Sequence, residues 1–183
     1  MNKIIVVLFL LTVSQVSAQE SEVFWKTKFY TLDSFQVSMN SFKGKPLVLI
    51  LINSSNPDMK LLSFMDSIYR VSADKFGMIG ILTHKKENSL SRNNLLSLFR
   101  SNKGISFPIA SISSAKNEHS KDERNFIFEW LSENLINKHF KLDFNESSVL
   151  ILNNRSALYA VLSADALPTA AHLDIIIDNG VEN

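Results

Sequence analysis

The residues best placed for chemistry form the short polar run from Asn53 to Asn56, between an apolar run and a helical pattern. Loops that join a buried strand to a helix N-terminus hold reactive groups or anions in many α/β proteins. This loop offers the hydroxyls of Ser54 and Ser55 and the amide of Asn56. No G-x-S-x-G elbow surrounds the serines and the sequence shows no obvious general base, so serine-hydrolase chemistry is not indicated.

Cysteine is absent from the whole sequence. This absence excludes thiol redox chemistry, iron–sulfur ligation and thiolate zinc sites. The histidines are scattered without ligand spacing, so we expect no metal site and no cofactor. They are His84, His119, His139 and His172.

Residues 1–18 have the organisation of a secretory signal peptide. Lys3 precedes an apolar run from Ile4 to Val13, and small residues lead to Ala18. The run is short for a membrane anchor, so we expect no stable membrane insertion once the signal has been cleaved after Ala18. The sequence therefore predicts export to the periplasm or the extracellular space, with residues 19–183 forming a single domain.

Charge argues against two classes of partner. Removing residues 1–18 lowers the count of basic residues from 19 to 18, which equals the 18 acidic residues. A balanced chain has no electrostatic reason to bind nucleic acid or an acidic membrane surface.

The polar loop must be positioned by the elements on either side of it. Residues 47–52 are apolar without interruption, which predicts a strand buried on both faces. We interpret Asn56 as the N-cap of the next helix and Pro57 as its first residue. One helical face then carries Leu61, Leu62, Met65, Ile68 and Tyr69. Residues 76–82 form a second buried strand, parallel to the first because a helix crosses over between them.

The rest of the chain supplies two hairpins and further helices. We expect a hairpin of residues 29–32 and 35–39, a helix capped by Ser91 and ending at Gly104, an extended piece over 105–109, a helix over 127–135, a hairpin of 149–152 and 158–162, and a helix from Pro168. A mixed central β-sheet flanked by helices, in the α/β class, fits this order.

Several strings, in their order and spacing, resemble the glutathione peroxidase family. They are Gly44-Lys45 with the strand leading to Asn56, Ile81 to Lys86, Phe107-Pro108, Trp130-Leu131 and Lys141-Leu142-Asp143-Phe144. The resemblance covers roughly residues 28–178 and implies a thioredoxin-like fold with glutathione-peroxidase-like topology. The thiol-dependent redoxins of bacterial envelopes share that fold and are the nearest alternative family.

Peroxide reduction in this family depends on a cysteine or selenocysteine, a glutamine, a tryptophan and an asparagine. The resemblance places these positions at Asn56, Lys86, Leu142 and Asp143, so all four depart from the family pattern. An amide is not a nucleophile at neutral pH and cannot cycle through a sulfenic acid. We therefore expect no peroxidase activity. Lys86 and Asp143 would flank one pocket and could form an ion pair there.

These observations lead to one expected function and its alternatives. The expected function is that of an exported, glutathione-peroxidase-like protein that has lost its thiol and binds or scaffolds an unknown protein or small molecule. The alternatives are a thiol-independent enzyme using the pocket around Asn56, Lys86 and Asp143, or a homologue of the envelope redoxins. The segment between Trp130 and Phe144 lacks the long insertion that tetrameric family members tend to carry, which favours a monomer.

Overall fold

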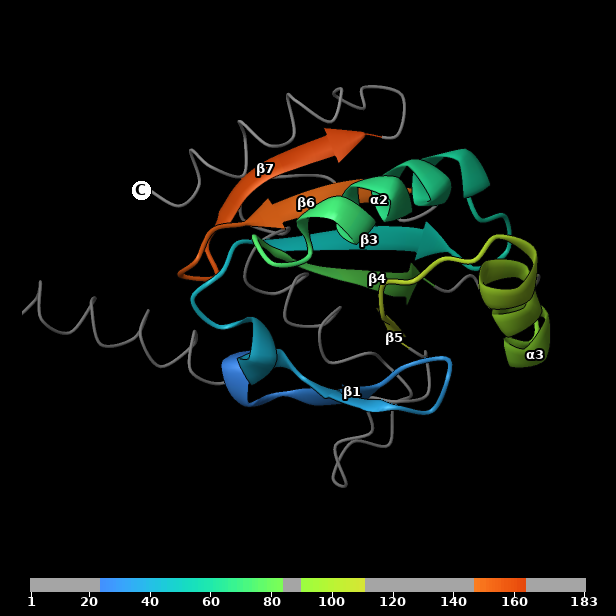
Figure 1. The fold of residues 1–183 in the computed structure, drawn as a ribbon, viewed down its shortest axis with the longest axis horizontal. Coiled ribbons are helices and arrows are strands. Elements are labelled where there is room, and N and C mark those ends of the chain that lie inside the picture. Colours follow the sequence, from blue (N-terminus) through green and yellow to red (C-terminus); the bar gives the residue numbers. More distant parts are fainter. Residues whose placement is uncertain (1–23, 84–89, 111–146, 164–183) are drawn as a thin grey trace, which may run out of the picture.

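A computed structural model describes residues 24–83, 90–110 and 147–163 of the chain. A five-stranded sheet forms its centre, with strand order β5-β4-β3-β6-β7 (Figure 1). Its strands are β3 (Leu47–Asn53), β4 (Gly77–Thr83), β5 (Ile109–Ala110), β6 (Ser148–Leu152) and β7 (Leu158–Ser163). The mixed α/β architecture expected from the sequence is confirmed.

Strand β3 lies in the middle of the sheet, as the apolar run predicts. It pairs in parallel with β4 and antiparallel with β6, and its six apolar residues are fully buried. Gly80 of β4 allows close packing, because a Cβ there would lie 2.8 Å from the Cδ1 atom of Ile52 and would force that side chain to move. The predicted parallel pairing and the late antiparallel hairpin of β6 and β7 are both confirmed.

Helix α2 (Met59–Ser72) covers one face of this sheet (Figure 1). Alternate residues of a strand point to opposite faces, so Val48, Ile50 and Ile52 all face the helical side. They pack with the predicted helix face, of which Leu61, Leu62, Met65 and Ile68 are buried and Tyr69 is partly buried. Helix α3 (Arg92–Leu96) continues into a π-helical turn, η2 (Ser97–Asn102), whose Phe99 completes this layer.

The opposite face is covered by the N-terminal part of the described chain. Strands β1 (Lys28–Tyr30) and β2 (Gln36–Ser38) form the predicted hairpin, followed by the 3-10 turn η1 (Met39–Phe42). Phe24, Trp25, Phe29 and Met39 pack against the inward residues of this face, among them Leu47, Leu49, Leu51, Ile79 and Ile81. The hairpin also reaches the edge of the sheet, where Thr31 forms an antiparallel bridge with Ala110.

The helix boundaries agree with the sequence except at one point. Ser91 accepts a hydrogen bond from the Asn94 amide and caps α3, and Gly104 follows η2 with φ at +64°. The interpretation of Asn56 as the N-cap of α2 is wrong, because Asp58 occupies that position. The helices expected over 127–135 and from Pro168 lie outside the described residues. In the part of the chain that is described, no helix has the length and hydropathy needed to cross a membrane.

Candidate functional site

The polar loop lies at one end of the central sheet. Strands β3 and β4 both finish there, with Asn53 opposite Thr83, and β6 begins at the same end, with Ser148 opposite Leu51. Ser54, Thr83, Ser147 and Ser148 are buried at this end. The sheet therefore ends in a cluster of hydroxyl and amide groups that carries no formal charge.

Two of these hydroxyls, those of Ser54 and Thr83, join the two strand ends. The Ser54 backbone amide and Oγ both donate to the carbonyl of Thr83, at 3.2 and 2.8 Å. Thr83 Oγ1 in turn donates to the carbonyl of Ile52 at 3.2 Å. Buried hydroxyls with such partners stabilise the fold and are poorly placed to attack a substrate.

Asn53 shapes the backbone of the loop. Its Oδ1 accepts hydrogen bonds from the amides of Ser55, at 2.9 Å, and Asn56, at 3.3 Å. This side-chain-to-backbone pattern is an Asx turn, in which asparagine replaces a backbone acceptor. The Leu90 amide, from the next loop, donates to the Ser54 carbonyl at 3.3 Å.

The N-cap of α2 is formed two residues later than the sequence pattern indicated. Asp58 Oδ1 accepts from the amides of Lys60 and Leu61, each at 3.0 Å. A carboxylate at this position satisfies two first-turn donors and complements the positive end of the helix dipole. The Asn56 amide is instead taken up by the Asx turn of Asn53, and Pro57 precedes the helix rather than starting it.

The four positions implied by the family resemblance are only partly described. Asn56 lies on the exposed side of the loop. Lys86, Leu142 and Asp143 lie outside the described residues, as do all four histidines, so the convergence of these positions on one pocket stays a prediction. Among the described residues, no group of histidine and acidic side chains could hold a metal ion.

The sequence pointed to the Ser55 hydroxyl but not to its burial. Ser55 Oγ is buried, and it has no hydrogen-bond partner among the described residues. An unpaired buried hydroxyl costs roughly 1–3 kcal/mol, so native proteins rarely retain one without a reason. The sequence could not reveal it, because two adjacent serines look alike until the loop is folded.

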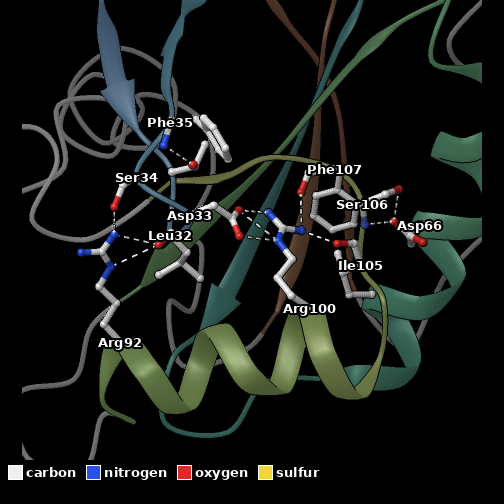
Figure 2. A network of polar contacts seen from close by, with 11 residues as sticks. Leu32, Asp33, Ser34, Phe35, Asp66, Arg92, Arg100, Ile105, Ser106 and Phe107 are labelled. Carbon is white, nitrogen blue, oxygen red and sulfur yellow. Dashed lines mark hydrogen bonds and ion pairs between the residues drawn. The ribbon is translucent and has the colours of Figure 1, made fainter.

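Charged groups gather elsewhere, between the β1–β2 turn and α2 (Figure 2). The Asp33 carboxylate accepts hydrogen bonds from the guanidinium of Arg100. The Asp66 carboxylate accepts hydrogen bonds from Arg70 and from the backbone amide and hydroxyl of Ser106. The hydrogen bond from Arg100 lowers the pKa of Asp33 below its ordinary 3.8. Burial alone would raise the pKa of Asp66, but the hydrogen bonds from Ser106 and Arg70 together lower it.

Comparison with known proteins identifies the architecture. No protein-family model matches the sequence, and no curated protein matches it. Solved structures do match. A thiol:disulfide interchange protein of the thioredoxin family from Chlorobium tepidum TLS superposes with a TM-score of 0.60 at 15% identity, covering 84% of this chain and 92% of that one. The chain has a thioredoxin-like fold.

Two further structures support the same assignment. The apo form of Trgpx has a TM-score of 0.57 at 12% identity and covers 87% of this chain and 95% of its own. A secreted disulfide oxidoreductase of Mycobacterium tuberculosis, homologous to E. coli DsbE, has a TM-score of 0.55 at 12% identity, with 85% and 96% covered. At identities this low, the superpositions show a shared fold and nothing more. This thioredoxin-like chain has no cysteine with which to perform thiol chemistry.

Proposed function

We propose that this protein is an exported, thioredoxin-like binding or scaffold protein without thiol chemistry, derived from a glutathione-peroxidase-like ancestor. The observation that carries the proposal is the absence of cysteine from a chain whose structural neighbours include a thiol:disulfide interchange protein and a disulfide oxidoreductase. No other side chain can take the place of a thiolate that is oxidised and reduced in each cycle.

The geometry of the polar loop supports binding in preference to catalysis. The hydroxyls of Ser54 and Thr83 hydrogen-bond at the strand ends, and the side-chain oxygen of Asn53 hydrogen-bonds to the loop backbone. The exposed Asn56 side chain can both donate and accept hydrogen bonds without carrying charge. A neutral, preorganised loop of this kind suits recognition of an uncharged polar group on a partner.

Site-specific photocrosslinking tests whether the loop contacts a partner. A photoreactive amino acid at position 56 should give a discrete adduct in cells that produce the protein. The matched control is position 71, because Val71 is exposed on α2 far along the helix from the loop. Equal adducts at both positions, or none at position 56, would refute a binding role for this loop.

The proposal also includes export, with residues 1–18 removed and residues 19–183 acting as a monomeric domain. The secreted state of the Mycobacterium tuberculosis neighbour is consistent with an exported use of the same fold. Mass spectrometry of the protein recovered from periplasm or medium should give an N-terminus at Gln19. Recovery of the full chain beginning at Met1 from the cytosol would contradict this part of the proposal.

A second candidate function, a thiol-independent enzyme using the pocket around Asn56, Lys86 and Asp143, draws support from Ser55. Its buried Oγ lacks a partner among the described residues, as expected of a group that meets a ligand. The Ser55→Ala variant separates the two functions. If the protein only binds, Ser55→Ala should leave the photocrosslinked adduct at position 56 unchanged. If the protein is an enzyme, Ser55→Ala should abolish the turnover that the wild-type protein shows.

A further inference from the structure

The segment Ile105–Phe107 is held from two sides by charged groups (Figure 2). On one side, Asp66 Oδ1 accepts from the backbone amide and the Oγ of Ser106, at 2.5 and 2.7 Å. On the other side, Arg100 Nη1 donates to the carbonyls of Ile105 and Phe107. The amide and the carbonyls of one short segment therefore depend on a carboxylate from α2 and an arginine from η2.

Arg100 connects this segment to the β1–β2 turn. Asp33, in that turn, accepts from Arg100 Nε at 3.0 Å and from Nη2 at 2.6 Å. Arg92 adds a second connection by donating to the Leu32 carbonyl at 2.8 Å and to Ser34 Oγ at 2.5 Å. The Arg100 guanidinium thus connects the carboxylate of Asp33, 67 residues away in sequence, to the carbonyls of Ile105 and Phe107.

The π-helical turn explains how both arginines reach the hairpin. At 3.6 residues per turn, eight residues of α-helix would leave Arg92 and Arg100 about 80° apart around the axis. The π-turn η2 holds more residues per turn than an α-helix, so it reduces this angle. Figure 2 shows both side chains rising from the same side of the helix toward the turn.

The held segment leads directly into β5, at the edge of the sheet. The Pro108 carbonyl accepts from the Gly80 amide, and the Ile109 carbonyl accepts from the Leu32 amide, each at 2.9 Å. Beneath this edge lies β4, which is buried along its whole length. A long apolar strand edge is prone to pair with other chains unless a loop or strand covers it.

We propose that the β1–β2 turn, the segment Ile105–Phe107 and β5 form a single latch over β4, held shut by Asp33 and Asp66 and opening as one unit when these carboxylates are neutralised. Among the described residues, the charged groups facing the two carboxylates are Arg100 and Arg92 at Asp33, and Arg70 at Asp66. All are cations, so each carboxylate is retained in its charged form and the latch stays shut at neutral pH.

Hydrogen exchange of the purified protein, followed by mass spectrometry, tests whether the latch opens as a unit. The variants are Asp33→Asn and Asp66→Asn, with Asp74→Asn as the matched control, because Asp74 is an exposed acid just beyond α2. Asp66→Asn should speed exchange of peptides over 31–36 about tenfold or more, although Asp66 does not contact that turn. Asp33→Asn should do the same for peptides over 105–110, while peptides of β3 and β6 keep their wild-type protection.

The proposal is overturned if each variant changes only the segment that its own carboxylate touches. It is also overturned if Asp74→Asn speeds exchange as much as the other two. If a variant also loses protection in β3, the whole fold is destabilised, and acid titration of the wild-type protein then tests whether the latch opens as one unit. A shared midpoint for loss of protection in 31–36 and 105–110, with β3 still protected, supports a single latch, and two separate midpoints contradict it.

Discussion

The polar loop Asn53–Asn56 and the latch around Arg100 use polar groups in opposite ways. The loop relies on neutral groups, and its contacts join near neighbours in sequence or the ends of adjacent strands. The latch relies on ion pairs, and the contact between Arg100 and Asp33 spans 67 residues. Among the described residues, ion pairs therefore fasten the edge of the sheet, while the loop Asn53–Asn56 uses only neutral groups and the neighbouring Asp58 carboxylate caps α2.

This difference matters for function. A reaction that develops charge needs charged or strongly polarised groups aimed at it. The ion pairs of Arg100 with Asp33 and of Arg70 with Asp66 involve no residue of the loop. What the loop presents is hydrogen bonding without charge, as expected for recognition.

Breaking the latch should have the largest effect. Arg100→Ala leaves the Asp33 carboxylate without its partner and removes a donor from two carbonyls. We expect a loss of about 2–4 kcal/mol in the free energy of unfolding, because one member of a partly buried charged network is removed. Urea denaturation measures it. The control, Arg155→Ala at an exposed turn, should stay within about 0.5 kcal/mol of wild type.

Acid should weaken the same region. The pKa values of Asp33 and Asp66 are lowered in the folded state, so both groups stabilise the fold fully above their unfolded pKa. That stabilisation is lost as the pH falls below about 3.8 and through the lowered folded values. The difference in unfolding free energy between wild type and the Asp33→Asn/Asp66→Asn double variant should shrink from pH 6 to pH 3. A constant difference over this range would contradict the assignment.

Substitutions at and beside the loop should change the stability less than those in the latch, and Asp58 should matter more than Asn56. Asp58→Ala removes the acceptor for the Lys60 and Leu61 amides and should cost about 1 kcal/mol. Asp58→Asn should be nearly neutral, since asparagine caps about as well as aspartate. Asn56→Ala should also be nearly neutral. Thermal denaturation of the three variants checks this order, and a larger loss for Asn56→Ala would restore Asn56 as the structural residue.

The elements of the fold could be predicted because they depend on patterns that are local in sequence. The uninterrupted apolar run over 47–52 is not compatible with an exposed strand. The spacing of Leu61, Met65 and Ile68 predicts which side of α2 is buried. The cap was missed because Asn56 and Asp58 are both good N-caps, and only the Asx turn of Asn53 decides between them.

The latch and the site were harder to predict for a different reason. The partner of Arg100 lies in a hairpin far along the chain, and the direction of its side chain depends on a π-turn that the composition of residues 97–102 does not indicate. The sequence singled out the hydroxyls of Ser54 and Ser55 together, and only the folded loop shows that the Ser55 hydroxyl is buried without a partner among the described residues. Of the four positions taken from the family resemblance, only Asn56 lies in the described part of the chain, where it stands exposed on the loop.

The most direct test of the central claim is turnover by the purified protein. Reduction of hydrogen peroxide or a lipid hydroperoxide, with glutathione or thioredoxin as reductant, should proceed at the rate of buffer alone. A chain with no cysteine offers no thiolate to attack the peroxide and no sulfenic acid to be reduced. Turnover that co-purifies with the protein and persists after removal of contaminating enzymes and bound metals would contradict the account.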